Sequence, residues 1–203
     1  MYCIGLTGGI ATGKSTVVDM LRSFGAAIVD CDVLARDVVQ PGTKVLQQVA
    51  AQFGPKSLFA DGSMDRAYIG SIVFNVPERK KELEDILFPC IHARIDEEIA
   101  SIQQQQPDAI IILDMPLLYE VQYSSYVDEV WLVYVDGATQ LQRLMARNNY
   151  SEDEAKARIQ SQWPIDKKKG LAQVVIDNRG TLEATKDQVR TAWQALTTKL
   201  SKT

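Results

Sequence analysis

The fold of this chain is decided by the stretch Gly8-Gly9-Ile10-Ala11-Thr12-Gly13-Lys14-Ser15. It matches the pattern G-x-x-x-x-G-K-[ST], in which glycines let backbone N–H groups surround phosphate oxygens and a helix N-terminus adds partial positive charge. The apolar run at residues 2–6 precedes the stretch, and a helix with apolar residues on one face follows it. A strand, a glycine-rich loop and a helix in this order predict a phosphate-binding loop, or P-loop.

The residue types in the loop assign roles in binding ATP. We expect its phosphates to lie against Gly9, Ile10, Ala11, Thr12, Gly13, Lys14, Ser15 and Thr16. Lys14 reaches the β- and γ-phosphates as a mobile charge and is a candidate catalytic residue, while Ser15 supplies a hydroxyl ligand for Mg²⁺. The loop alone does not distinguish a kinase from a GTPase or a motor ATPase. The chain lacks the N-K-x-D pattern that reads guanine, so a small kinase is favoured.

Short apolar runs alternate with helical stretches along the chain. We expect strands at residues 2–6, 26–29, 109–113, 130–135 and 174–176. These runs are rich in Val, Ile and Leu without strict alternation, as expected when helices cover both faces of a sheet. The pattern predicts a three-layer α/β fold with a parallel sheet and a helical insertion between two of its strands.

Several residues mark where helices begin and end. We expect the first helix to start near Gly13, and another to run from Thr43 to a stop at Gly54. Pro77 can open a long helix, which Pro89 should kink or split. Late in the chain, Ser151 and Glu154 fit a capping box, and Thr181 can cap the final helix.

Composition excludes several classes of protein. The chain has 203 residues and a net charge of −4, which argues against a nucleic-acid partner. Its three cysteines show no C-x-x-C spacing, so we expect a reduced, cytoplasmic setting. A single histidine cannot build a multi-histidine metal site. The apolar run at residues 109–113 is too short to span a membrane. We also expect a monomer or a weak homo-oligomer.

Acidic residues follow two of the expected strands. In open α/β sheets, ligands bind beyond the carboxyl ends of the strands. Asp32, in Asp30-Cys31-Asp32, is therefore a candidate to accept or orient the proton of an attacking hydroxyl; alternatively, it caps the helix at residues 33–39. For Asp30 a structural role is equally open. Asp114 has the layout of a Walker-B carboxylate that touches Mg²⁺, or it is a simple turn residue before Met115-Pro116.

Basic residues cluster late in the chain. Arg143 and Arg147 are four residues apart and share one helix face, from which a mobile lid can neutralise charge on the transferred phosphoryl group. The alternative is a solvated basic face. We interpret Lys167-Lys168-Lys169 as a solvated charge run and Trp163 as a packing residue.

Taken together and in order, these segments resemble dephospho-CoA kinases. The segments are residues 6–10 with 13–16, 29–32 with Ala35-Arg36, Pro41-Gly42, 61–66 with Val73-Phe74, 114–120, Gln140 with Arg143 and Arg147, and 175–178 with Gly180. The resemblance spans nearly the whole chain. It implies a single P-loop kinase domain over residues 1–203, with a core at about 1–39 and 108–203, an acceptor-binding insertion at about 40–107 and a lid at about 143–170.

The resemblance also implies an activity and a set of roles. ATP would phosphorylate the ribose 3′-hydroxyl of dephospho-CoA, which gives CoA and ADP in the last step of CoA synthesis. Asp32 would be the base. Arg66 and the Pro116-Leu117-Leu118 segment would contact the acceptor, and Asn178 would line the adenine pocket of ATP. Other hypotheses are a kinase for a nucleoside, a nucleotide or shikimate, and a nucleotide-dependent binding module without catalysis.

Two positions depart from the pattern of the family. Ala11 stands where a glycine is usual, which we expect to be tolerated with an ordinary negative φ. Phe88-Pro89-Cys90-Ile91 replaces the usual H-P-x-I, and His92 is nearby but out of register. The chain therefore lacks the histidine that the family carries at this place.

Overall fold

The computed structural model describes residues 1–74 and 76–202. The chain divides into two compact units. We call Met1–Val29 with Gln105–Thr203 the core unit, and Asp30–Gln104 the inserted unit. The insertion expected at about 40–107 falls largely within the inserted unit.

A parallel sheet forms the centre of the core unit. Its strands are β1 (Tyr2–Gly8), β2 (Ala27–Asp30), β3 (Ile110–Asp114), β4 (Glu129–Tyr134) and β5 (Val174–Asp177), in the spatial order β2-β3-β1-β4-β5. β1 pairs in parallel with β3 on one side and with β4 on the other, and β4 pairs in parallel with β5. All five expected strands are confirmed, with shifts of one or two residues at their ends.

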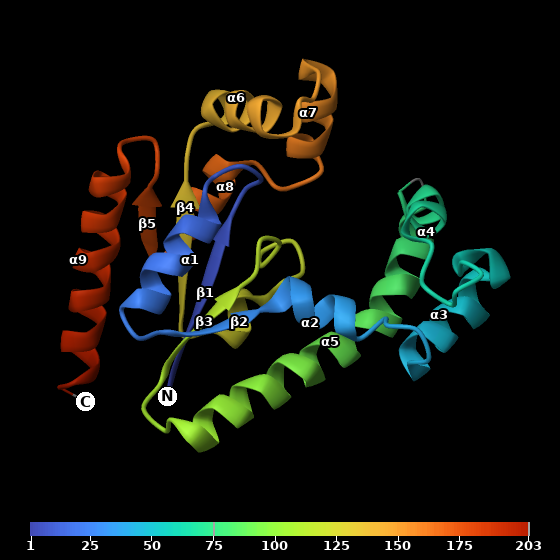
Figure 1. The fold of residues 1–203 in the computed structure, drawn as a ribbon, viewed down its shortest axis with the longest axis horizontal. Coiled ribbons are helices and arrows are strands. Elements are labelled where there is room, and N and C mark those ends of the chain that lie inside the picture. Colours follow the sequence, from blue (N-terminus) through green and yellow to red (C-terminus); the bar gives the residue numbers. More distant parts are fainter. Residues whose placement is uncertain (75, 203) are drawn as a thin grey trace. The chain divides into compact units, whose positions relative to one another are not determined.

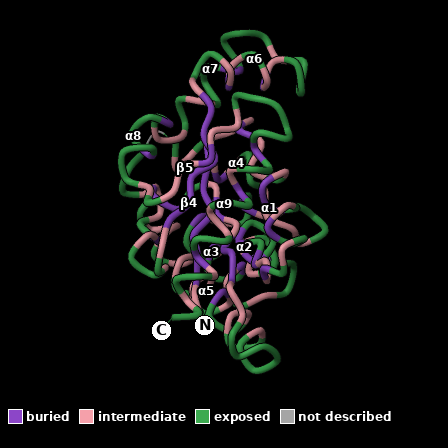
Figure 2. The backbone as a smooth tube through the Cα atoms, turned by 90° about the vertical axis from the view of Figure 1, so that its left-hand side faces the viewer, coloured by how far each residue is buried: buried purple, intermediate pink, exposed green. Residues whose placement is uncertain are grey.

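Helices pack on both faces of this sheet because alternate strand residues point in opposite directions. One face packs on α1 (Lys14–Ser23) and α9 (Leu182–Leu200), which touch each other, and Figure 1 shows α9 alongside β5. On the other face, α8 (Ile165–Lys169) packs its Ile165 against Leu132 and Tyr134 of β4. β4 is buried along nearly its whole length (Figure 2), which explains its unbroken apolar sequence.

Two further helices follow β4. α6 (Gly137–Asn148) is capped by Asp136, whose side chain accepts from the backbone N–H of Thr139 at 2.9 Å. α7 (Glu152–Gln160) begins with the expected capping box: Ser151 accepts from Glu154 N–H, and the Glu154 carboxylate accepts from Ser151 N–H. Thr181 caps α9 as expected. The segment expected at about 143–170 to act as a lid contains the end of α6, all of α7 and the short α8.

The inserted unit is helical. Its helices are α2 (Cys31–Asp37), α3 (Lys44–Phe53), the short η1 (Pro55–Ser57), α4 (Arg66–Val73) and α5 (Pro77–Gln105). Val49 and Phe53 of α3 pack with Ile69 of α4 and with apolar residues of α5. α5 continues through Pro89 without a break, and its axis bends part-way along (Figure 1), as expected where a proline removes one helical hydrogen bond.

Candidate active site

The phosphate loop connects the end of β1 to the first turn of α1. Gly13 occupies the N-cap position with φ 83° and ψ 25°, a left-handed conformation that favours glycine. No described side chain caps α1 by a hydrogen bond, so the positive end of this helix faces the loop. Such a helix end is a natural binding site for phosphate.

The backbone of Ala11 differs from the conformation expected from the sequence. Its φ is 61°, so the expected ordinary φ is wrong. The reason is a tight turn in which the N–H and the hydroxyl of Thr12 both donate to the carbonyl of Gly9, at 3.3 and 2.9 Å. Turns with a positive φ at their third residue favour glycine there. This chain accepts the strain of an alanine instead.

Lys14 and Asp114 meet at the carboxyl edge of the sheet. Asp114 ends β3 and stands in register with Leu6 of β1, two residues before the phosphate loop begins. The Lys14 ammonium forms an ion pair with the Asp114 carboxylate, and each side chain is 15% exposed. The loop lysine and the strand-end carboxylate that the sequence singled out are therefore brought together.

The same edge fits a Mg²⁺ ion bound chiefly through phosphates. Asp114 offers a carboxylate, and Ser15 is exposed in the first turn of α1. Among the described residues, no three His, Cys, Asp or Glu side chains cluster in a way that would hold a metal. Magnesium usually takes one or two protein oxygens and completes its shell with water and substrate phosphates. This donor set suits that mode of binding.

Arg143 and Asn178 lie against the phosphate loop. The Asn178 amide donates to the carbonyl of Thr12 at 2.8 Å, and its oxygen accepts from the buried Thr185 hydroxyl at 2.8 Å. Arg143 donates to the Asn178 backbone carbonyl at 2.9 Å. A Cβ at Gly13 would lie 2.2 Å from the Asn178 amide nitrogen, so this close approach requires glycine.

Arg147 has a different setting. Its side chain is exposed and donates to the Asn148 side chain at 2.8 Å. This hydrogen bond joins it to a neighbour in α6 and not to the phosphate loop, so its part in binding ATP stays a prediction.

Two glutamines also hold the loop: Gln140, which the sequence offered only as part of the family resemblance, and Gln162, which the sequence did not single out. Ile10 N–H donates to the side-chain oxygen of Gln162 at 2.8 Å, and the Gln140 amide donates to the Ile10 carbonyl at 2.9 Å. Gln140 is 3% exposed. Gln140 and Gln162 lie 130 and 152 residues from Ile10, and no local pattern signals such a contact.

Lys168 corrects the interpretation of a solvated charge run. Its side chain is fully buried; it forms an ion pair with Glu120 at 2.7 Å and donates to the Pro116 carbonyl at 3.0 Å. Burial lowers the pKa of Lys168, and the hydrogen bond to Glu120 opposes that shift. The short helix α8 explains the error, because Lys168 and the apolar Ile165 lie three residues apart and share its buried face.

Trp163 packs next to this pair. Its backbone N–H donates to the Glu120 carboxylate at 2.9 Å, and its ring lies parallel to that of Tyr119, with centroids 6.3 Å apart. Burial raises the pKa of Tyr119. The structure thus gives Trp163 the packing role that the sequence suggested.

The expected acceptor residues have contrasting environments. Leu117 is 40% exposed, while Leu118 is fully buried and Pro116 accepts hydrogen bonds from Thr7 and Lys168. Arg66 is exposed at the start of α4 in the inserted unit. Their contacts with an acceptor stay predictions.

Asp30, and not Asp32, caps the helix that follows β2. Asp30 caps α2, since its side chain accepts from Val33 N–H at 3.0 Å. The alternative that Asp32 is the cap is therefore wrong. The helix begins at Cys31, directly after β2, and this places Asp32 in the first turn with an exposed side chain. The structural role considered for Asp30 is confirmed.

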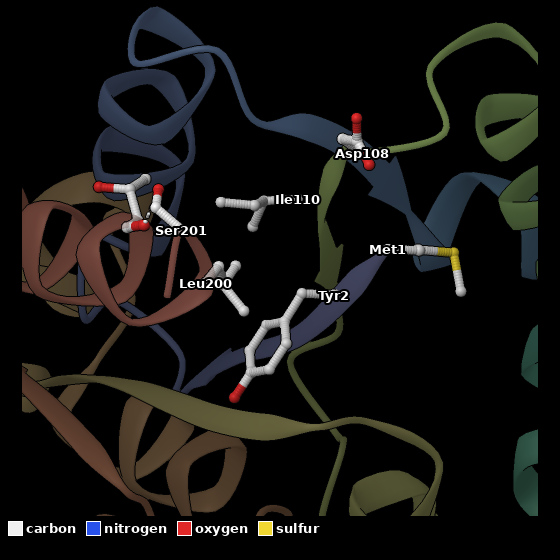
Figure 3. A pocket seen from close by; sticks show the side chains of 7 residues that line it. Met1, Tyr2, Asp108, Ile110, Leu200 and Ser201 are labelled. Carbon is white, nitrogen blue, oxygen red and sulfur yellow. Dashed lines mark hydrogen bonds between the residues drawn. The ribbon is translucent and has the colours of Figure 1, made fainter. Parts of the chain in front are cut away.

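A separate cavity lies at the opposite end of the strands. It has a volume of about 410 Å³, and the residues that line it include Tyr2 at the start of β1, Ile110 at the start of β3 and Leu200 in α9 (Figure 3). Ligands of open α/β sheets bind beyond the carboxyl ends of the strands, where the phosphate loop lies. This cavity is thus distinct from the candidate active site. In addition, none of the described helices is long and apolar enough to cross a lipid bilayer.

Comparisons with known proteins agree with this geometry. A family model described as dephospho-CoA kinase matches residues 2–184. A dephospho-CoA kinase of Staphylococcus haemolyticus is 51% identical over 177 residues, which cover 87% of each chain. One from Symbiobacterium thermophilum is 46% identical over 195 residues, covering 96% of this chain and 81% of its own.

Solved structures give the same result. A protein from Thermus thermophilus superposes with a TM-score of 0.82 at 31% identity, covering 98% of this chain and 97% of its own. The dephospho-CoA kinase from Campylobacter jejuni has a TM-score of 0.70 at 28% identity and 96% coverage of both chains.

Proposed function

This chain belongs to the dephospho-CoA kinase family, and from that premise we propose that it transfers the γ-phosphoryl group of ATP to the ribose 3′-hydroxyl of dephospho-CoA. The products are CoA and ADP. The family match carries the choice of acceptor, and the meeting of the Lys14 ammonium with Asp114 at a glycine-rich loop between β1 and α1 carries the phosphate donor. This pair supports a site that binds a nucleoside triphosphate.

Residues 9–16 bind the phosphates of ATP in this proposal, through backbone N–H groups other than that of Ile10, which donates to Gln162, and with the positive end of α1. Lys14 moves from Asp114 to the β- and γ-phosphates, where a mobile ammonium offsets negative charge as the phosphoryl group leaves ADP. Asp114 and Ser15 would hold Mg²⁺, which supplies further neutralisation of the phosphate oxygens when bound.

Asp32 is the proposed partner of the acceptor hydroxyl. The 3′-oxygen forms its bond to the γ-phosphorus while the bond from that phosphorus to the bridging oxygen of ADP breaks. The hydroxyl proton passes to the Asp32 carboxylate. Because the transition state of phosphoryl transfer is loose, orienting the hydroxyl matters as much as removing its proton. Asp30 caps α2, so the side chain of Asp32 is not needed as a cap. That side chain is exposed, which supports the proposed role.

Arginines complete the proposed machinery. Arg143, held at the loop by the Asn178 carbonyl, neutralises charge on the transferred group, and Arg147 adds charge when the lid at about 143–170 closes. Asn178 braces the loop and lies beside the adenine. Arg66 and residues 116–118 bind the acceptor. We place the reaction in the cytoplasm, where reduced cysteines are usual, with a monomer or a weak oligomer as the active form.

An acceptor panel tests the proposal. The purified protein is incubated with ATP and Mg²⁺ and with dephospho-CoA, a nucleoside monophosphate or shikimate in turn, and the products are identified by mass and by phosphorus NMR. We expect a 3′-phosphorylated product from dephospho-CoA alone. Turnover of another acceptor without turnover of dephospho-CoA would overturn the substrate, and ATP binding without any transfer would leave only a binding module.

A further inference from the structure

The phosphate loop of this chain is strained at one residue and held at its neighbour. Ala11 has a φ of 61°, a conformation that penalises any residue with a Cβ. Such a conformation persists only where surrounding contacts determine it. The contacts responsible must therefore act on the peptide groups on either side of Ala11.

Both backbone polar groups of Ile10 are fixed by side chains from distant parts of the chain. Gln162, which follows α7, accepts from Ile10 N–H at 2.8 Å, and Gln140, in α6, donates to the Ile10 carbonyl at 2.9 Å. On the other side, Asn178 donates to the Thr12 carbonyl at 2.8 Å. Three carboxamides thus hold the residues before and after Ala11.

The approach of Gln140 is built into the sequence of the loop. A Cβ at Gly9 would lie 2.3 Å from the Gln140 amide nitrogen, so only glycine leaves room for this contact. Gln140 is 3% exposed despite its polar side chain. Burying a carboxamide is favourable only when it is hydrogen-bonded, and Ile10 provides the partner.

We propose that Gln140 and Gln162 are positioning residues that hold the phosphate loop in its nucleotide-binding shape around the left-handed Ala11. The inference rests on the proposed function only in that this loop binds the phosphates of a nucleotide. A loop with glycine at position 11 adopts the same turn without penalty and needs the two glutamines less. The dependence of nucleotide affinity on Gln162 is therefore a consequence of Ala11.

A double-mutant cycle tests this coupling. Affinity for ADP is measured by titration calorimetry for Gln162→Ala in the natural chain and in an Ala11→Gly background. Losing one hydrogen bond to the loop should weaken ADP binding about fivefold when alanine is present. In the Ala11→Gly background we expect a loss of less than about twofold, because the turn no longer needs support. Equal losses in both backgrounds, or none in either, would overturn the proposal.

The matched control is Gln160→Ala, an exposed glutamine at the end of α7 that should change neither affinity. Thermal unfolding without ligand establishes that each variant is folded. As a second readout, amide exchange at Ile10 should accelerate in Gln162→Ala and stay slow in Gln162→Glu, which keeps an acceptor oxygen. Unchanged exchange in Gln162→Ala would contradict the contact itself. Since the readouts are ADP binding and exchange, failure of phosphoryl transfer to dephospho-CoA is a separate result.

Discussion

Single residues in and beside the phosphate loop are each suited to their position by charge or by size. Lys14 and Asp114 neutralise each other at the carboxyl edge of the sheet, which keeps both charges in place for a polyanionic ligand. Gly13 admits Asn178 at a distance that a side chain would prevent. Ala11 is the exception, because it adopts a glycine-like conformation without the freedom of glycine.

Replacing Ala11 by glycine should stabilise the protein. A non-glycine residue in the left-handed region costs about 1–2 kcal/mol, which glycine would remove. The greater entropy of glycine in the unfolded chain offsets part of this stabilisation. We expect Ala11→Gly to raise the free energy of unfolding by about 0.5–1 kcal/mol in urea titrations. The control Ala157→Gly, at an exposed position within α7, should lower it by a similar amount. A loss of stability in both variants would show that Ala11 is not strained.

The elements were largely predictable from local signals. The strands, the Ser151 capping box and the Thr181 cap depend on residues close together in sequence, and the structure confirms them. The sequence left open a cap of α2 by Asp32, whereas Asp30 forms it, because the position of the cap depends on where β2 ends. Such an end is fixed by pairing with a strand far along the chain, which no local pattern reveals.

The cap of α6 gives a pH dependence that belongs to the element. The N–H of Thr139 donates to Asp136 and holds the pKa of that carboxyl below its ordinary value of 3.8. Because the folded pKa is the lower one, the stability that this cap contributes is complete above the ordinary pKa. It is lost as pH falls from there through the folded pKa.

Asp136→Asn isolates that effect, since asparagine caps helices well and does not titrate. Unfolding midpoints in urea are compared between the natural chain and this variant from pH 6 to pH 2.5. We expect a constant difference above about pH 5 and a selective loss of stability in the natural chain below about pH 4. Asp136→Ala should be destabilised over the whole range. Parallel curves for Asp136→Asn and the natural chain would show that this cap is not coupled to acid unfolding.

At the scale of the molecule, one buried ion pair ties together segments far apart in sequence. The Lys168 ammonium of α8 contacts Glu120 and the Pro116 carbonyl after β3, and Thr7 at the end of β1 donates to the same carbonyl. Trp163 adds a hydrogen bond to Glu120. The loop expected to contact the acceptor is thereby joined both to the strand before the phosphate loop and to α8.

The sequence does not reveal these long-range contacts. Lys168 stands between two other lysines, and Gln162 has no neighbours that distinguish it from a solvated residue. Gln140 belongs to the segment that resembles the family, but that segment does not indicate its contact with the loop. Their partners are backbone groups or side chains that only the folded sheet brings near. The motif identified the residues expected to bind phosphate because they all lie within one short loop. The residues that support the loop come from elsewhere in the chain.

Removing one charge of this pair should be costly. Glu120→Gln keeps an acceptor for Trp163 but leaves the Lys168 ammonium buried without a carboxylate, so we expect a loss of about 3 kcal/mol in the free energy of unfolding. A double variant, Glu120→Leu with Lys168→Met, should recover most of it. As a control, Glu152→Gln breaks an exposed pair with Lys156 and should have little effect. If Glu120→Gln and Glu152→Gln were equally mild in urea titrations, Lys168 would not depend on its partner.

The most direct test of the account compares Asp32→Asn with Asp30→Asn, the same change of charge two residues apart. ATP affinity and the turnover of dephospho-CoA are measured for both. We predict that Asp32→Asn lowers kcat about a hundredfold or more while ATP affinity changes by less than about threefold. Asp30→Asn, which preserves the helix cap, should keep most of its turnover. Equal losses of turnover in the two variants, or a fall in ATP affinity as large as the fall in turnover, would contradict the assignment of Asp32 to the acceptor hydroxyl.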